Sequence, residues 1–154
     1  AIAAAASRRS GIEVIMSLGG TTVSEERVRK LQTGSVTVKA FVPQWAVLAE
    51  ADAFITHHGL NSTHEAIFGR VPMLSYPFFW DQPALATKCQ AFGVAMPLAA
   101  VPRAAITADT VHSALDRLVG GMAGLRAGLE VVRGYELGVM AGREAVLDRM
   151  LALA

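Results

Sequence analysis

Short apolar runs alternate with segments of helical spacing along most of the chain. The runs are short and rich in aliphatic residues, as strands are, and they cover residues 12–18, 36–41, 53–56, 73–76 and 94–96. Helical patterns precede or separate them, at residues 1–9, 24–27, 45–49, 62–68 and 83–92. Strands that alternate with single helices predict a parallel sheet with crossover helices, because parallel strands cannot be joined by tight turns.

From Thr107 onward the pattern is helical to the end of the chain, and we expect breaks near Gly120-Gly121 and Gly134. Glycine favours such breaks because it is a poor helix former. Several apolar residues of this segment recur at core spacings, namely Leu115, Leu118, Leu125, Leu129, Val132, Val146 and Leu147. We therefore interpret these last helices as structural.

The totals fit one compact domain. The chain has 154 residues, of which 53% are hydrophobic and 18% charged, and a formal net charge of +1. This balance, with scattered basic residues, argues against nucleic acid as a partner. No apolar run reaches the roughly 20 residues of a membrane-spanning helix. The single Cys89 excludes an internal disulfide and fits a small core residue, and with no visible signal peptide we expect a cytoplasmic protein.

A polar stretch, THHGLNSTHE at 56–65, follows the third apolar run and opens the next helical pattern. In a doubly wound sheet, ligands bind beyond the carboxyl ends of the strands, where this stretch would lie. Gly59 permits close approach of the backbone to a ligand, and the free amides of a helix N-terminus suit a phosphate. Asn61, Ser62 and Thr63 add side-chain donors. Glu65 would repel phosphate but would accept hydrogen bonds from neutral hydroxyls, such as those of a ribose.

Two other interpretations of this stretch stay open. Ser62 and Glu65 have the spacing of a capping box, in which Ser62 is the N-cap and Glu65 reaches back to its amide. A metal site built from His57, His58 and His64 is also conceivable, although these residues lack the i, i+4 pair that zinc enzymes favour.

A second polar turn, YPFFWDQPALA at 76–86, follows the fourth apolar run. Asp81 precedes Pro83, which starts helices well, so Asp81 could simply be an N-cap. The carboxylate of Asp81 beside the carboxamide of Gln82 also offers acceptors and donors to sugar hydroxyls. Residues 78–80 could form an apolar wall of the site or belong to the core.

A third feature is Phe41-Val42-Pro43-Gln44, after the second apolar run. The ring of Phe41 could stack on a flat base, and Gln44 or nearby backbone could bond to the edge of that base. The alternative is a strand end followed by a proline turn.

Together these features resemble one family. The run at 41–98, FVPQWAVLAEADAFITHHGLNSTHEAIFGRVPMLSYPFFWDQPALATKCQAFGVAMPL, is similar to the donor-binding signature of the family 1 glycosyltransferases. These include UDP-sugar-dependent transferases and bacterial enzymes that glycosylate antibiotics. The resemblance implies a GT-B fold, with two Rossmann-like lobes and the active site between them. This chain would be the C-terminal lobe, a three-layer α/β/α domain with a parallel sheet that binds the nucleotide-sugar.

The resemblance also implies roles for individual residues. His57, Gly59, Asn61 and Ser62 would bind the diphosphate. The base and ribose would be held by Phe41, Val42, Gln44 and Glu65, and the donor sugar by Asp81 and Gln82. No metal and no cofactor is expected besides a UDP- or dTDP-sugar donor.

The sequence departs from the family in three respects. His58 stands where a small residue or cysteine is usual, and Leu60 replaces the tryptophan of plant members. The N-terminal acceptor lobe, which usually carries the catalytic base, has no counterpart here, so no catalytic residue is expected in residues 1–154. We also expect the first strand of the C-terminal lobe to lie outside residues 1–154, unless residues 12–22 are that strand.

The function implied is that of the donor-binding half of an inverting glycosyltransferase, with a natural product as acceptor. We expect the chain alone to be inactive and to self-associate through an uncovered last helix. Two alternatives remain open: a stand-alone nucleotide-sugar-binding subunit that needs a separate acceptor-binding chain, and a sugar-nucleotide epimerase of the same fold.

Overall fold

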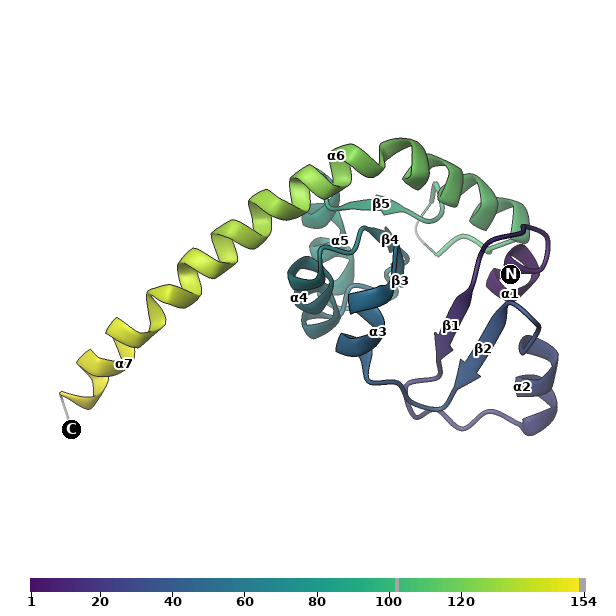
Figure 1. The fold of residues 1–154 in the computed structure, drawn as a ribbon, viewed down its shortest axis with the longest axis horizontal. Helices are drawn as coiled ribbons and strands as arrows, with labels where there is room; N and C mark the ends of the chain where they lie inside the picture. Colours follow the sequence, from purple (N-terminus) through teal and green to yellow (C-terminus); the bar gives the residue numbers. More distant parts are fainter. Residues whose placement is uncertain (102, 153–154) are drawn as a thin grey trace.

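The computed structural model describes residues 1–101 and 103–152 and has an α/β fold (Figure 1). The strands are β1 (Val14–Ser17), β2 (Val36–Lys39), β3 (Phe54–Thr56), β4 (Met73–Ser75) and β5 (Ala95–Pro97). The helices are α1 (Ile2–Ala6), α2 (Glu25–Leu31), α3 (Gln44–Glu50), α4 (Leu60–Gly69), α5 (Gln82–Ala91), α6 (Ala108–Ala141) and α7 (Arg143–Leu151). The alternation predicted from the sequence is confirmed, with strand ends that differ by at most two residues.

All the strand pairs are parallel, but they form two sheets. One sheet contains β1 and β2, and the other has the order β3-β4-β5. Val14 donates its amide to the carbonyl of Ser35, and Phe54 donates its amide to that of Pro72, so each ladder follows the parallel pattern. In Figure 1, β1 is drawn between β2 and β3. β1 and β3 therefore each keep one edge without a paired strand among the described residues.

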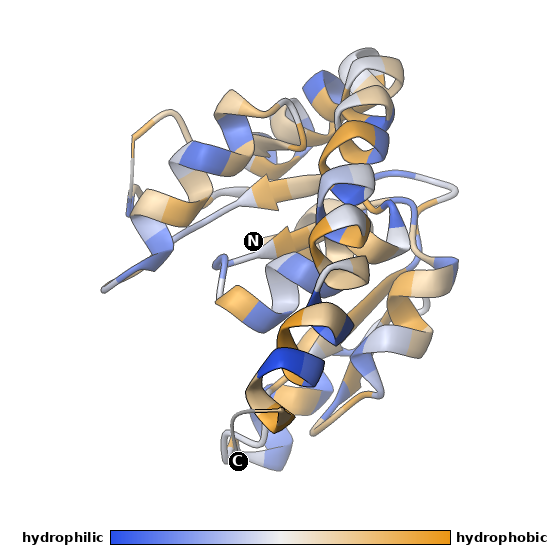
Figure 2. Cartoon of the chain, turned by 90° about the vertical axis from the view of Figure 1, so that its left-hand side faces the viewer, coloured by the Kyte–Doolittle hydropathy of each residue, from blue (hydrophilic) through white to orange (hydrophobic). Residues whose placement is uncertain are grey.

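The faces of the first sheet are covered unequally. One face, which carries Val14, Met16, Val36 and Val38, packs on α1 and α2 in one apolar cluster. The other face carries Ile15, which is 54% exposed, and borders α3 across a cavity. Figure 2 shows that the strands are mostly hydrophobic, as expected for parallel sheets.

The expectation of helix breaks near Gly120-Gly121 and Gly134 is wrong, as helix α6 shows. It runs without interruption from Ala108 to Ala141, past Gly120, Gly121 and Gly134. Two glycines of this helix serve close packing. A Cβ on Gly121 would lie 2.4 Å from the Cε of Met96, and one on Gly128 would lie 2.6 Å from the carbonyl oxygen of Gly93. The glycines therefore let α6 approach β5 and the turn before it.

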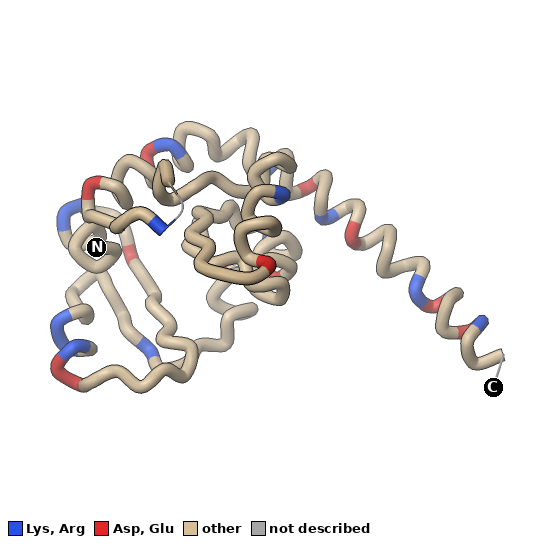
Figure 3. Tube along the Cα trace, turned by 180° about the vertical axis from the view of Figure 1, so that it is seen from behind, with Lys and Arg blue, Asp and Glu red and all other residues tan. Residues whose placement is uncertain are grey.

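The predicted core of the last helices is confirmed in its first half. Leu118, Leu125 and Leu129 are buried, and Leu115 and Val132 are partly buried against the same clusters. Val146 and Leu147 are 57% and 56% exposed, because the end of α6 and all of α7 project away from the sheets (Figure 1). Charges of both signs are scattered along the chain (Figure 3). Among the described residues, no helix is long and apolar enough to cross a membrane.

Candidate functional site

The three polar features lie at the carboxyl ends of strands. The turns after β3 and β4 share one edge of the sheet, because Thr56 and Ser75 are register partners in parallel strands. The feature after β2 joins them through Gln44. Its Nε2 donates to Ser62 Oγ at 3.1 Å and to Glu65 Oε2 at 2.8 Å.

The turn between β3 and α4 leaves the start of the helix uncapped. Helix α4 begins at Leu60, and its N-cap residue is Gly59, which provides no side-chain cap to the first amides. The capping-box interpretation is therefore wrong, since Ser62 lies within the first turn and Glu65 accepts a bond from Gln44 instead. The first amides of an uncapped α-helix are free donors, and the helix dipole adds a partial positive charge there.

A glycine at position 59 serves the packing of the turn as well as the access of a ligand. Its φ is −62°, which any residue adopts. However, a Cβ on Gly59 would lie 2.9 Å from Nε2 of His57, so a side chain here would displace that ring. His57 itself is exposed and lies against the start of α4. The glycine thus allows an imidazole to stand beside the free helix amides.

His58 is the most constrained residue of this turn. It is fully buried and has a φ of 63°, in the left-handed region. Its backbone amide donates to Thr56 Oγ1 at 3.1 Å. Its Nε2 lies 2.7 Å from Ser75 Oγ, and its Nδ1 lies 3.3 Å from Thr63 Oγ1. One residue therefore connects β3, β4 and α4 by hydrogen bonds.

The imidazole of His58 is neutral at pH 7. Burial, reinforced by the neighbouring His57, lowers the pKa of His58 from 6.5 to about 4. A neutral ring has one donor and one acceptor nitrogen. Because a hydroxyl can donate or accept, Ser75 and Thr63 together provide a hydrogen-bond partner for each of these two nitrogens.

The second polar turn is built differently. Gln82 is buried, and its Oε1 accepts hydrogen bonds from the amides of Phe78 and Phe79 at 3.0 and 3.3 Å. Asp81 is exposed and stands at the N-cap position of α5, but its side chain does not cap the helix. The aromatic residues of this turn are exposed rather than in the core; they are Phe78, Phe79 and Trp80.

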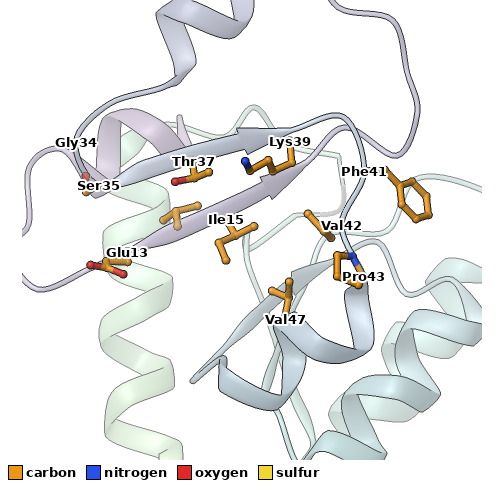
Figure 4. A pocket seen from close by; sticks show the side chains of 11 residues that line it. Glu13, Ile15, Gly34, Ser35, Thr37, Lys39, Phe41, Val42, Pro43 and Val47 are labelled. Carbon is orange, nitrogen blue, oxygen red and sulfur yellow. The ribbon is translucent and has the colours of Figure 1, made fainter.

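Phe41 and Val42 line a cavity of about 430 Å³ between the open face of the first sheet and α3. Figure 4 shows Ile15 and Val47 facing one another across it, while Phe41 extends outward at its rim. The ring of Phe41 is 78% exposed, so it has a free face. The cavity does not include the start of α4.

The histidines form no metal cluster. Within residues 1–101 and 103–152, no group of three or more His, Cys, Asp or Glu side chains could hold a metal ion. His64 points to α6, where its Nδ1 lies 2.9 Å from Glu136 Oε1. Cys89 is buried as predicted, and burial together with Glu136 raises its pKa to about 11, so the thiol is inert.

Two polar residues at the strand ends beside His58 were missed in the sequence. Thr56 and Ser75 are buried polar residues that end otherwise apolar strands, and His58 bonds to both. The signal was present in the sequence, because a polar residue closing each of two neighbouring buried strands needs a hydrogen-bond partner.

These features lie together on a parallel α/β lobe, and comparison with known proteins identifies the family. A profile of the erythromycin biosynthesis protein CIII-like C-terminal domain matches residues 5–138. The chain belongs to this family, and its fold is that of the C-terminal lobe of GT-B glycosyltransferases.

Individual relatives support this family assignment and fold. The chain is 34% identical over 108 residues to the NDP-glycosyltransferase YjiC of Bacillus subtilis (strain 168), which is 70% of this chain and 26% of that protein. The glycotransferase of kitacinnamycin aligns with a TM-score of 0.61 and 28% identity over 82% of this chain and 40% of its own. Spinosyn forosaminyltransferase SpnP aligns with a TM-score of 0.67 and 24% identity over 86% of this chain and 32% of its own. The chain thus spans less than half the length of each of these relatives.

Proposed function

We propose that this chain is the donor-binding half of a glycosyltransferase that uses a nucleoside diphosphate sugar. The observation that carries the proposal is the uncapped start of α4, with His57 beside it and the cluster of Gln44, Ser62 and Glu65 next to it. The amides of Leu60, Asn61 and Ser62 would bind the diphosphate. Glu65, oriented by Gln44, would accept hydrogen bonds from the ribose hydroxyls.

The same groups would also contribute to catalysis. In sugar transfer, the leaving diphosphate gains negative charge as its bond to the sugar breaks. Helix amides and His57 would stabilise that charge, and a helix dipole contributes about 0.3–1 kcal/mol at the surface and up to about 2 kcal/mol when partly buried. A base that deprotonates the acceptor would come from a second lobe. Attack by the acceptor from the opposite side of the sugar would invert the anomeric carbon.

The gap between the two sheets supports the proposal that a further strand completes this lobe. Helices α1 and α2 pack on the same face of the first sheet. Because strand-helix-strand crossovers are right-handed, a strand before α1 would lie beside β1 on the side away from β2. The amide and carbonyl of Ile15 point to that side, since its neighbours in β1 bond to β2. The strand would fill the space between β1 and β3.

The names of the relatives inform the substrates. One is an NDP-glycosyltransferase and two are named for natural products. We therefore propose a UDP- or dTDP-sugar as donor and a natural product as acceptor, in a cytoplasmic enzyme. Phe41, with an exposed ring face, would stack on the base, and Val42 would bond to its edge. Asp81 would contact the sugar, and Gln82 would do so through its Nε2, since its Oε1 accepts bonds from the loop amides.

Calorimetric titration of the chain with UDP and dTDP, alongside Glu65→Ala, tests the proposal. We expect saturable binding that Glu65→Ala weakens about tenfold, the equivalent of one charge-assisted hydrogen bond. The loss should be larger for UDP than for dTDP, which lacks the 2′-hydroxyl. Glu25→Ala, at an exposed position of α2, is the control and should bind as the unmodified chain does. Absence of saturable binding by the folded chain would contradict the proposal.

A further inference from the structure

His58 stands beside the proposed diphosphate site but faces away from it. Its side chain is fully buried, so it cannot touch a ligand at the start of α4. Its backbone conformation, with φ at 63°, is one that residues with a Cβ adopt rarely. Glycine would adopt the same conformation without strain. A histidine here therefore needs a reason.

The hydrogen bonds around His58 have one consistent direction. Thr63 Oγ1 donates to the carbonyl of Gly59 at 3.0 Å. A hydroxyl has a single proton, so Thr63 Oγ1 must accept at its contact with Nδ1 of His58, and Nδ1 carries the imidazole proton. Nε2 is then the acceptor and receives the hydroxyl proton of Ser75. The chain of bonds runs from Ser75 through His58 and Thr63 to Gly59.

The carbonyl of Gly59 is the point where this chain reaches the ligand site. It accepts two bonds from Thr63, one from the hydroxyl and one from the backbone amide at 3.0 Å. The same peptide group contains the amide of Leu60, which points in the opposite direction because the peptide is planar. Fixing the Gly59 carbonyl therefore also fixes the direction of the Leu60 amide, which points away from the helix toward the proposed ligand site.

We propose that His58 is a positioning residue that aims the amides at the start of α4 toward a diphosphate. The proposal rests on the donor-binding function proposed above. It assigns His58 no contact with the ligand and no proton transfer. Its effect runs from the strand ends at Thr56 and Ser75, through the ring, to the Gly59 peptide.

The His58→Gly variant distinguishes a positioning role of His58 from a histidine that the fold merely tolerates. If His58 were only tolerated, His58→Gly would relieve the backbone and bind UDP at least as tightly as the unmodified chain. We expect instead that His58→Gly weakens UDP binding about tenfold, since the Gly59 peptide loses its support. Calorimetry at pH 7 measures the difference.

Thr63→Val tests the same chain if His58→Gly fails to fold, because it removes only the hydroxyl. We expect UDP binding about fivefold weaker, within the range of one net hydrogen bond. Thr87→Val is the matched control. Thr87 makes the same bond to a carbonyl four residues earlier, that of Pro83 at 2.9 Å, but on an exposed face of α5. The control should bind UDP as the unmodified chain does.

Nitrogen chemical shifts of the His58 ring add a readout that does not depend on UDP. The proposal requires a neutral ring with the proton on Nδ1, and a proton on Nε2 would overturn it. Unchanged UDP binding by His58→Gly, or equal binding by Thr63→Val and Thr87→Val, would overturn the positioning role while leaving donor binding intact. Failure of the unmodified chain to bind UDP would instead overturn the proposed function, and the positioning role with it.

Discussion

The turns after β3 and β4 are neighbours at one edge of the sheet, and each contains a non-glycine residue in the left-handed region. His58 has a φ of 63° and is 0% exposed, whereas Trp80 has a φ of 54° and is 89% exposed. His58 is held by hydrogen bonds from two strands and a helix. Trp80 makes an edge-to-face contact with Phe79, with ring centroids 4.9 Å apart.

Under the proposed function, the difference would serve two kinds of recognition at one site. The first turn fixes its backbone by burying polar side chains, which suits a ligand group bound by amides. The second turn leaves side chains in solvent and fixes its loop through the buried Gln82. A diphosphate is the same in every donor, but the sugar varies. Under the proposed function, a turn held by buried polar groups would bind the constant diphosphate, and a turn with exposed side chains would contact the variable sugar.

Replacing each left-handed residue by leucine should separate the turns most strongly. His58→Leu keeps the volume but leaves the hydroxyls of Ser75 and Thr63 without their ring partner. We expect the free energy of unfolding to fall by about 3 kcal/mol, the range for buried polar groups left unpaired. Trp80→Leu, the matched control at an exposed position, should change it by less than about 0.5 kcal/mol. Urea unfolding followed by circular dichroism measures both. Equal losses would contradict the contrast between the turns.

Acid should weaken the first turn selectively. His58 has a folded pKa of about 4 and an ordinary value of 6.5, so between these pH values the unfolded chain binds more protons than the folded chain. The stabilisation from the neutral ring is therefore complete above pH 6.5 and is lost as the pH falls toward 4. The loss is on the order of 3 kcal/mol.

His58→Asn provides the control for this pH dependence, because asparagine tolerates the left-handed region and does not titrate. The difference in unfolding free energy between pH 7 and pH 4.5 should be smaller for His58→Asn than for the unmodified chain. The same pH dependence in both proteins would show that other groups cause it.

The smallest effect is expected at the second turn. Trp80→Gly removes the strain of a side chain in the left-handed region but adds backbone freedom to the unfolded chain. The two terms oppose each other, and we expect a net gain of about 0.5 kcal/mol in unfolding free energy. Thermal unfolding measures it. A loss above about 1 kcal/mol would mean that the tryptophan ring supports the turn despite its exposure.

The alternation of elements could be predicted from the sequence because buried parallel strands are apolar and their helices have a different period. The turns could also be placed, since their polar residues follow the strands directly. The long helix could not, because glycine is read as a helix breaker, whereas Gly121 and Gly128 serve contacts with Met96 and Gly93. Such contacts exist only between segments distant in sequence.

The inner hydrogen bonds of the site were also out of reach of sequence reasoning. Spacing alone favoured Glu65 as a capping residue, but its actual partner, Gln44, comes from another helix. His58 looked like a tolerated departure from the family pattern. Its role follows from Thr56, Thr63 and Ser75, which meet it only in the folded chain.

The most direct test of the central claim is a titration of the isotopically labelled chain with UDP, followed through its backbone amide resonances. The account predicts saturable shifts that are largest for the amides of Leu60, Asn61 and Ser62 at the start of α4, with smaller shifts at Phe41 and Gln44. Shifts concentrated elsewhere, for example at Val23 before α2 and Arg29 within it, would contradict the account, as would a folded chain whose spectrum UDP leaves unchanged.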